Sequence, residues 1–395
     1  MRLQKNKMTL LLFNLATDVD DPILGFTTSW IQALAKHCDT IHVITMRQGR
    51  LELPDNVKVY SVGKEKGYSK PRRAFEFYRH LIRILANNHI DACLAHMMPL
   101  FAVMGAPLLK IKGVPIILWY AHGHVSLMLK LAEKLVNRIV TSTPEGCRLS
   151  SDKIQVIGQG INTTQFYCEN RKRSFSSKHI ELLYIGRISP VKKIEVLVDA
   201  LTMLIERNSE LVFSLKIVGS APDEKAKKYE KYLHDKVREL CIEYAVIFTG
   251  GVSHKEVAEF YRNTHFILNP SQTGSMDKTL LEGICAGAIP ITSNIAYKDG
   301  LLGIDPILYY MQIIIILYAD NNVGGIPELI QDGETGLLVD PCNPQQIAES
   351  LNRLLDNESL AREIGVKARS GIVSEYSFEK GIERYINLIY DVCYK

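Results

Sequence analysis

Apolar residues follow two alternating patterns along the first half of the chain. Short apolar runs predict buried strands, and stretches in which apolar residues recur every three or four positions predict helices. The expected strands are 40–45, 57–62, 92–95, 114–119, 138–142 and 154–157, and the expected helices are 27–36, 74–87 and 126–136. Strands that alternate with helices in this way form a parallel sheet with helices on both faces.

The N-terminal segment has two interpretations. Residues 1–7 are basic and residues 8–16 are apolar, which is also the pattern of a short signal peptide. Because an aspartate-rich segment, 17–21, follows in place of a small-residue cleavage site, we expect a first strand here. A second apolar run at 307–318 is too short to span a bilayer, so no transmembrane helix is predicted.

The alternation of strands and helices returns between residues 180 and 339. A polar and charged stretch, 167–179, separates the two halves and has the composition of a linker. A chain of 395 residues is long enough to form two cores. We therefore expect an N-terminal domain of residues 1–172 and a C-terminal domain of residues 173–376.

Composition and charge exclude several classes of protein. Hydrophobic residues make up 47% of the chain and charged residues 23%, as in a soluble globular protein. The net charge of +4 is too small to favour nucleic acid as a partner. The eight cysteines lack CxxC or CxH spacing, which argues against a metal site and a disulfide framework and is typical of a reducing cytoplasm.

A short stretch in the second half combines a strand, a cationic turn and a helix. The apolar run 182–185 predicts a buried strand, which stops at Gly186. Arg187 and Lys192 follow, and helical spacing begins at Ile194. In an open α/β sheet, ligands bind at the carboxyl ends of strands, and two cations beside the positive end of a helix suit a diphosphate. The alternative is a turn whose basic side chains are only solvated.

This stretch, GRISPVKK, resembles the donor-binding signature of the family-four retaining glycosyltransferases (glycosyl transferases group 1), which have the GT-B fold. Later segments resemble the same family: KIVGSAPDE at 216–224, VIFTGGVSHKEVAEFYRNTHFILNPS at 246–271, LLEGICAGAIPITSN at 280–294 and GGIPELIQDGETGLLVDP at 324–341. The resemblance implies two Rossmann-like parallel-sheet domains that face each other across a cleft, with the terminal helix 377–395 packed back on the first domain. It also implies transfer of a sugar, with retention, from a nucleotide-diphosphate donor.

The resemblance assigns roles to residues of the second domain. Arg187 and Lys192 would stabilise the charge that develops on the diphosphate, in place of a metal or another cofactor. Gly186 and Gly219 would lie in turns that bind the donor, whereas Lys193, which stands where the family usually has glycine, receives no role. Glu282 would accept hydrogen bonds from both ribose hydroxyls, and the alternative for Glu282 is a helix residue with a structural partner.

One carboxylate of the family's paired-glutamate motif is missing from this chain. The first glutamate is expected where the chain has Gly274. Ser275 and Lys278 are candidates to bind the donor from the same loop. Asp277 could supply a carboxylate, although its register differs by three positions. The resemblance therefore predicts a donor loop of unusual composition.

Candidate groups of the first domain follow its predicted strands. His122 resembles a histidine of the family that contacts the donor sugar, and Gly25 lies in a glycine-containing first loop near acceptor and diphosphate. His96 and His124 are further candidates, although a histidine that is hydrogen-bonded within a loop explains His96 equally well. The turn 160–162, Gly-Ile-Asn, resembles the family's segment at the domain junction.

Two segments lie outside these assignments. The basic stretch 64–83 is either a solvated helix and loop or a contact with anionic lipid headgroups, which would suit an acceptor carried on a lipid. The segment 295–321 interrupts the resemblance and has an apolar centre, YYMQIIIILY. We expect it to be an insert, and it could be an added strand or hairpin, a partner surface, or a disruption of the donor loop.

Taken together, these patterns favour a metal-independent hexosyltransferase. It would move a sugar from a nucleotide-sugar donor to a glycan or lipid-linked acceptor in the synthesis of cell-surface polysaccharide or glycolipid. We expect it in the cytoplasm or peripherally on the inner face of the membrane. The alternative is a catalytically impaired homologue that binds a nucleotide sugar or a protein partner. A nicotinamide-dependent oxidoreductase is disfavoured, because no GxGxxG follows the first strand.

Overall fold

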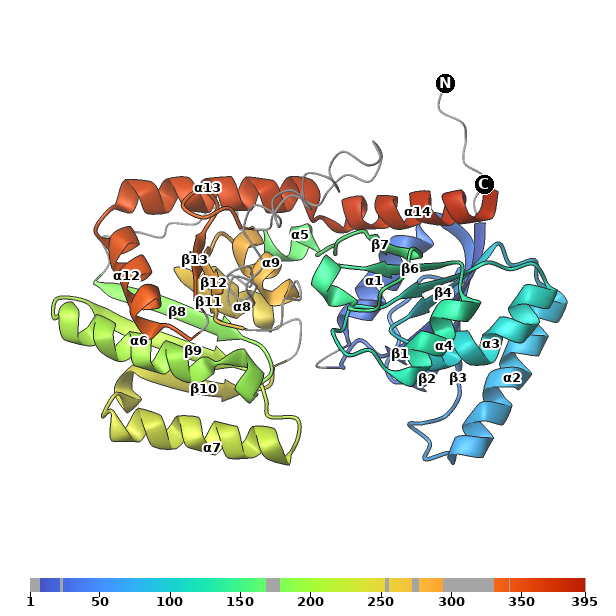
Figure 1. The fold of residues 1–395 in the computed structure, drawn as a ribbon, viewed down its shortest axis with the longest axis horizontal. Coiled ribbons are helices and arrows are strands. Elements are labelled where there is room, and N and C mark those ends of the chain that lie inside the picture. Colours follow the sequence, from blue (N-terminus) through green and yellow to red (C-terminus); the bar gives the residue numbers. More distant parts are fainter. Residues whose placement is uncertain are drawn as a thin grey trace, which may run out of the picture. The chain divides into compact units, whose positions relative to one another are not determined.

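The chain divides into two compact units (Figure 1). The computed structural model describes residues 8–21, 24–167, 178–252, 256–271, 277–293, 330–340 and 342–394. The first unit comprises Met1–Asn162 and Tyr376–Lys395, and the second comprises Thr163–Glu375. The second unit begins before the expected boundary at residues 172 and 173, because the short helix α5 (Thr163–Phe166) packs against helices of that unit.

The first unit is built on a sheet of seven parallel strands. Their order is β3-β2-β1-β4-β5-β6-β7, so the first strand lies inside the sheet, between β2 and β4. The N-terminal apolar run is therefore a core strand, as predicted. The strands are β1 (Met8–Thr17), β2 (Cys38–Gln48), β3 (Val57–Ser61), β4 (Ala92–His96), β5 (Ile116–Trp119), β6 (Arg138–Thr141) and β7 (Ile154–Val156).

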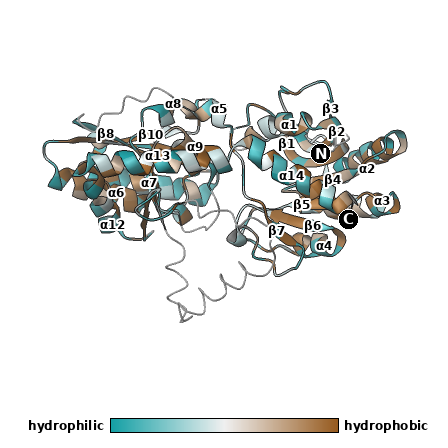
Figure 2. Ribbon diagram, turned by 90° about the horizontal axis from the view of Figure 1, so that it is seen from above, coloured by the Kyte–Doolittle hydropathy of each residue, from teal (hydrophilic) through white to brown (hydrophobic). Residues whose placement is uncertain are grey.

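Helices cover both faces of this sheet, because successive side chains of a strand point to opposite faces. On one face, Leu10 and Leu12 of β1 pack with α1 (Phe26–Ala35) and the terminal helix α14 (Phe378–Tyr394). On the other, Leu11 and Phe13 pack with α2 (Lys70–Asn87), α3 (Pro99–Ile111) and α4 (Leu127–Leu135). Figure 2 shows strands β5 and β6 as hydrophobic, whereas the helices carry apolar and polar positions.

Helix α3 was not predicted from the sequence. Pro99 lies in its first turn, but Gly105 and Pro107 lie in its interior, where both residue types normally weaken a helix. The structure tolerates them because Phe101, Ala102 and Ala106 are buried in the core, and Pro107 faces outward. Burial of this apolar face outweighs the local preference of the two residues.

The second unit repeats the same architecture. The six parallel strands that the structure describes here have the order β10-β9-β8-β11-β12-β13, and their buried side chains belong to one core cluster. The strands are β8 (His179–Ile185), β9 (Val212–Val218), β10 (Val246–Gly250), β11 (Phe266–Asn269), β12 (Ile289–Ser293) and β13 (Leu337–Val339). The helices are α6 (Ile194–Arg207), α7 (Glu224–Glu239), α8 (Val257–Arg262), α9 (Lys278–Cys285), α12 (Pro344–Leu355) and α13 (Glu358–Glu375). The expected insert, 295–321, lies outside the described residues.

The segments at which the chain leaves and re-enters the first unit lie side by side. The Ile161 N–H donates to the Tyr376 carbonyl at 2.8 Å, and the Phe378 N–H donates to the Ile161 carbonyl at 2.8 Å. A Cβ at Gly160 would lie 3.0 Å from the Ser377 oxygen. The predicted Gly-Ile-Asn turn therefore pairs with the start of the terminal helix, and glycine permits the close approach.

The turns after β8 and β9 approach each other more closely than side chains allow. A Cβ at Gly219 would lie 1.9 Å from the carbonyl oxygen of Gly186, and Gly219 has a φ of +151°. The Gly186 N–H donates to the Val218 carbonyl at 2.9 Å, which continues the β8–β9 pairing into the turn. Gly186 and Gly219 thus both lie at the carboxyl edge of the second sheet. At Gly219 any side chain would collide with the Gly186 carbonyl oxygen, so glycine is required there.

Substitution at Gly219 tests this requirement. Gly219→Ala should destabilise the protein by about 1–3 kcal/mol, because the methyl group overlaps a backbone oxygen that cannot move without breaking strand pairing. Gly371→Ala on exposed α13 is the matched control, since a Cβ there meets nothing within 4 Å, and it should stabilise by about 0.5–1 kcal/mol. Urea unfolding of both variants measures the difference. A Gly219→Ala protein as stable as wild type would contradict the close approach.

Candidate functional site

Lys192 is a buried cation at the carboxyl edge of the second sheet. The chain leaves β8, turns through the 3₁₀ helix η2 (Pro190–Lys192) and places the Lys192 side chain in the interior, where the residue is 7% exposed. Its Nζ lies 2.8 Å from Asp277 Oδ2 and 3.3 Å from Ser271 Oγ. A buried ammonium needs such a partner, because desolvation strongly penalises an isolated charge.

Asp277 also links Lys192 to two neighbouring strands. Asn269, at the end of β11, donates from Nδ2 to Asp277 Oδ2 at 2.7 Å. The Asn269 side-chain oxygen accepts the Ser271 N–H at 3.1 Å, and its carbonyl accepts the Thr292 hydroxyl at 2.9 Å. The ends of β8, β11 and β12 and the start of α9 therefore meet in one polar network. Sequence analysis missed Asn269 and Ser271, because nothing in a linear pattern brings them to Lys192.

Arg187 lies on the same loop but faces outward. Its side chain is exposed, and its carbonyl accepts the Tyr184 hydroxyl at 3.0 Å. Burial, together with the charge of Asp277, raises the pKa of Tyr184 well above its usual value, so the phenol remains a neutral donor to this carbonyl. The loop thus presents one fixed, buried cation and one accessible guanidinium, an arrangement that suits an anion with more than one oxygen.

The positive end of helix α6 is occupied, which corrects the sequence-based expectation that it would contribute to anion binding. The Tyr229 hydroxyl, from α7, accepts the N–H of Ile194 at 2.8 Å and that of Glu195 at 3.3 Å, and it donates to the Glu195 carboxylate. Lys193 before the helix has a φ of +53°, in the left-handed region that favours glycine. Protein atoms therefore satisfy the N–H groups of Ile194 and Glu195, and the cations of the loop remain the candidates for binding an anion.

Glu282 lies on α9 with its side chain in the interior. The residue is 4% exposed, and its Oε2 accepts the Tyr261 hydroxyl of α8 at 3.0 Å. Burial and the Glu282 charge together raise the pKa of Tyr261 well above its usual value. Glu282 thus has the structural partner that the alternative interpretation requires. A second role of Glu282 toward a ribose stays a prediction.

Lys278 is the first residue of α9. Burial lowers the pKa of its amine to about 7, and the negative charge of Glu282 opposes this shift without cancelling it. A cation that titrates near neutrality at the edge of this network can gain its proton when an anion binds. Gly274 and Ser275, from the same predicted loop, lie outside the described residues.

The first-unit histidines occupy different environments. His122 is exposed after β5, and its Nδ1 accepts the His124 N–H at 3.0 Å. His96 is buried at the end of β4 and stacks on Trp30 with ring centroids 5.3 Å apart, and on Trp119 at 6.4 Å. His96 is therefore a strand residue packed against aromatic rings, which differs from the hydrogen-bonded loop histidine considered above. His122 faces solvent at the carboxyl edge of the sheet.

Gly25 begins α1 within a tightly held loop. Its N–H donates to the Asp21 carbonyl at 2.9 Å, and a Cβ would lie 2.7 Å from that oxygen. The Asp21 side chain forms a salt bridge with Arg47, near the carboxyl end of β2. Two aspartates of segment 17–21 thus form salt bridges with arginines, namely Asp21 with Arg47 and Asp20 with Arg50. Their negative charge was the feature of the sequence that could have indicated these contacts.

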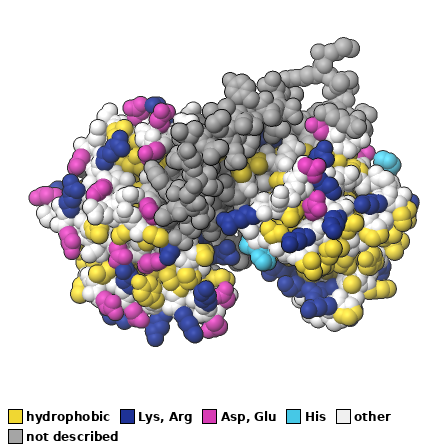
Figure 3. Space-filling view, viewed as in Figure 1, with side chains coloured by type: hydrophobic (Ala, Val, Ile, Leu, Met, Phe, Trp, Pro, Cys, Tyr) yellow, Lys and Arg dark blue, Asp and Glu magenta, His cyan; other side chains and the backbone are white. Residues whose placement is uncertain are grey.

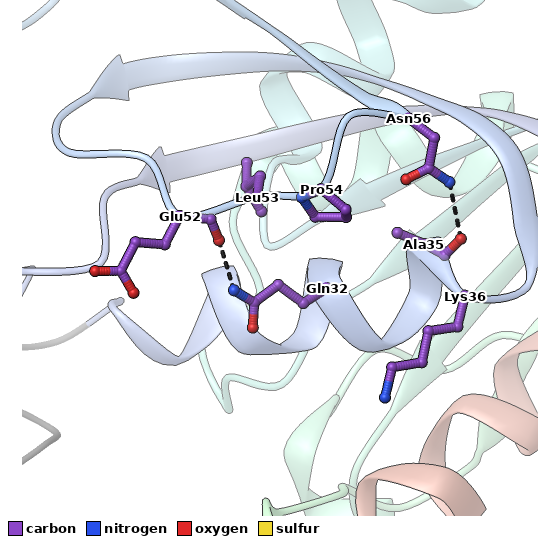
Figure 4. Close-up of a pocket in the computed structure, with 7 residues that line it drawn as sticks. All are labelled: Gln32, Ala35, Lys36, Glu52, Leu53, Pro54 and Asn56. Atoms are coloured by element: carbon purple, nitrogen blue, oxygen red, sulfur yellow. Dashed lines mark hydrogen bonds between the residues drawn. The ribbon is translucent and has the colours of Figure 1, made fainter.

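Two other features carry no assignment. Among the described residues, no group of three His, Cys, Asp or Glu side chains is arranged to hold a metal ion. An open hollow in the first unit, between the end of α1 and the loop before β3, is lined by Gln32, Ala35, Lys36, Glu52, Leu53, Pro54 and Asn56 (Figure 4). There Gln32 and Asn56 donate to backbone carbonyls, so these amides serve the loop itself.

Comparison with protein families places both units. Residues 168–298 and 310–371 match the family model Glycosyl transferases group 1, and residues 19–142 match Glycosyl transferase 4-like. The unmatched stretch 299–309 falls within the segment 295–321 expected as an insert. The two models together cover most of the chain, including the Lys192 network and the loop of Gly25.

Curated relatives are glycosyltransferases. Two uncharacterized glycosyltransferases of Methanocaldococcus jannaschii are 26% identical over 259 residues (63% of this chain, 55% of the relative) and 23% identical over 373 residues (91% and 92%). The lipopolysaccharide 1,2-N-acetylglucosaminetransferase of Salmonella typhimurium is 29% identical over 208 residues (52% and 46%). The chain spans about half the length of several of the curated relatives it matches.

Solved structures share the architecture at low identity. HepE of Anabaena, in complex with UDP, has a TM-score of 0.70 at 15% identity and covers 97% of this chain and 100% of its own. Sucrose-phosphate synthase of Thermosynechococcus elongatus has a TM-score of 0.70 at 15% identity, with 98% and 99% covered. The chain is a member of the group 1 glycosyltransferase family, and its two Rossmann-like units form the GT-B fold.

Proposed function

We propose that this protein is a retaining glycosyltransferase that takes a sugar from a nucleoside-diphosphate donor. The observation that carries the proposal is the cationic loop after β8. This loop contains both buried Lys192 and exposed Arg187, at the carboxyl edge of the sheet. The names of HepE complexes with UDP and with UDP-glucose support a nucleotide-sugar donor. Retention rests on the family resemblance, and the acceptor is proposed to be a glycan or a lipid-linked glycan of cell-surface polysaccharide or glycolipid synthesis.

The chemistry requires charge stabilisation at the leaving group. When the bond between the anomeric carbon and the diphosphate breaks, negative charge grows on the phosphate oxygens. Lys192 and Arg187 are proposed to stabilise that charge, with Lys278 as a third cation, and no metal or other cofactor is needed in this scheme. Gly186 and Gly219 let the backbone approach the donor, and Glu282 is proposed to accept hydrogen bonds from the ribose.

First-unit residues complete the proposal. His122 would contact the donor sugar, and the loop of Gly25 would lie near the acceptor and the diphosphate. Both lie at the carboxyl edge of the first sheet, one after β5 and the other after β1. That edge is where ligands bind in doubly wound sheets.

An acceptor carried on a lipid would need the protein at a membrane, and the helices α2, α3 and α4 support that idea. Large apolar side chains are exposed on all three, with Phe75 at 65%, Ile111 at 80% and Leu127 at 71%. Figure 3 shows apolar side chains gathered on this face with Lys and Arg among them. The basic residues are Lys70, Arg72, Arg73, Arg79, Arg83, Lys110, Lys112, Lys130 and Lys134, against the acidic Glu76 and Glu133.

Such a face combines anchors for an interface with attraction to anionic headgroups. None of the helices that the structure describes is both long and apolar enough to cross a membrane. We therefore propose peripheral contact with the inner face of an anionic membrane through α2, α3 and α4, the face defined above. The basic stretch 64–83 identified from the sequence supplies much of its charge.

The second candidate function is binding of a nucleotide sugar without turnover. Gly274, which replaces the first glutamate of the family motif, favours it, because the chain lacks a carboxylate that its relatives' motif contains. Purified protein that binds UDP or GDP but neither hydrolyses nor transfers any nucleotide sugar would establish this alternative. Turnover of one donor would exclude it.

Removing either cation of the loop tests the main proposal. Arg187→Ala and Lys192→Ala should each lower transfer about 10- to 1000-fold, the range for loss of one electrostatic contact in a transition state. Transfer from a radiolabelled nucleotide sugar, at enzyme concentrations that allow single turnovers, measures the rates. Lys225→Ala, which removes an exposed cation from α7, is the control and should leave transfer unchanged.

The same assay tests the absence of a metal requirement. Transfer should survive EDTA, because side chains carry the compensating charge. Loss of activity with EDTA and recovery with Mg²⁺ or Mn²⁺ would overturn that part of the proposal.

In the mutagenesis test, full activity of Arg187→Ala would show that Arg187 does not stabilise the leaving group.

Lys278 should make diphosphate binding depend on pH. Its amine, with a pKa of about 7, is charged below pH 7 and neutral above it. Calorimetric titration with UDP should therefore show tighter binding by wild type than by Lys278→Ala at pH 6, and a smaller difference at pH 8. The phosphate's own titration affects both proteins equally, so the difference isolates Lys278. An identical pH profile in both proteins would leave Lys278 outside the site.

Vesicle binding tests the membrane face. Arg72→Gln/Arg83→Gln should weaken binding to phosphatidylglycerol vesicles by roughly 30-fold, because each cation near an anionic surface contributes about 1 kcal/mol. Lys225→Gln/Lys231→Gln on α7 changes the net charge equally and is the matched control. Cosedimentation measures binding. Equal losses in the two double variants, or equal binding of wild type to neutral phosphatidylcholine vesicles, would contradict this face as the contact.

A further inference from the structure

Asp277 stands at the N-cap position of α9 but does not cap that helix. Its carboxylate makes no hydrogen bond to the first turn of α9 and is directed instead to Lys192 and Asn269. Asp223, at the same position of α7 in the same unit, behaves in the usual way, since its Oδ1 accepts the Ala226 N–H at 2.9 Å. Asp277 therefore forgoes a stabilising cap in order to contact the buried ammonium.

The geometry around Lys192 constrains the direction of its hydrogens. An ammonium carries three N–H donors. Among the described residues, Asp277 Oδ2 accepts one at 2.8 Å and Ser271 Oγ accepts another at 3.3 Å. Asn269 Nδ2 also donates to Asp277 Oδ2, at 2.7 Å, so the carboxylate is itself held in place. With two donors engaged, the third has a defined direction.

We propose that Asp277 is the positioning residue of Lys192: it orients the ammonium so that one N–H is presented to a phosphate oxygen of the donor. The inference rests on the proposed function and adds a role for Asp277 within it. Asp277 would supply a carboxylate close to the position where the family motif has a glutamate and this chain has Gly274. Asp277 acts through Lys192 and does not itself touch the donor. Its charge also compensates the desolvation of Lys192, which is 9% exposed in its side chain.

Asp277→Asn keeps the size of the side chain and removes its charge. The variant should bind UDP or GDP, whichever binds wild type, about 3- to 10-fold more weakly. It should lower kcat by a larger factor, about 10- to 100-fold, because the phosphate carries more charge in the transition state than in the bound donor. Asp277→Glu, which retains the charge, should recover part of kcat. Asp223→Asn is the matched control, since asparagine caps a helix as well as aspartate does, and it should change neither quantity.

A double-mutant cycle separates positioning from a merely structural role. In a Lys192→Met background, where Asp277 has no ammonium to orient, Asp277→Asn should change neither UDP affinity nor single-turnover rate by more than about 2-fold. The same loss in both backgrounds would overturn the proposal, and so would unchanged or tighter UDP binding by Asp277→Asn alone. Wild-type protein that binds neither UDP nor GDP would instead overturn the proposed function, so the two failures are distinguishable.

Discussion

Parallel strand pairing is the constraint on which the second unit depends. Because the strands are parallel, the carboxyl ends of β8, β11 and β12 and the start of α9 share one edge of the sheet. The close approach at Gly219 keeps the turn after β8 against its neighbour. Lys192 and Asp277, far apart in sequence, come within 2.8 Å of each other as a result.

Desolvation at this edge gives three cations three different properties. Lys192 is buried with a carboxylate beside it, so its position is fixed. Lys278 is desolvated with Glu282 as its compensating charge, and its pKa falls to about 7. Arg187 remains exposed on the loop. A site with a fixed, a titratable and an accessible cation can meet a multiply charged ligand at several oxygens, which is what a diphosphate offers.

The first unit divides its polar and apolar groups between two locations. The carboxyl edge of its sheet presents His122 and the loop of Gly25, which the Asp21–Arg47 salt bridge anchors. The face of α2, α3 and α4 carries exposed apolar side chains among basic ones. The proposed donor contact and the proposed membrane contact therefore use different residues of the first unit.

The sequence by itself determined the fold class, the alternation of strands and helices, and the cationic loop that contains Arg187 and Lys192, because these depend on local periodicity and short motifs. It did not predict α3, where burial of the apolar face outweighs the helix-breaking tendency of Pro107. It also predicted that the N-terminal end of α6 helps to bind an anion, whereas the Tyr229 hydroxyl accepts the N–H groups there. Only the tertiary structure decided that His96 is packed between aromatic rings and that Asp277 faces Lys192. These outcomes depend on burial and on contacts between distant segments, which set the charge and hydrogen-bond partners of a side chain and leave no periodic trace in the sequence.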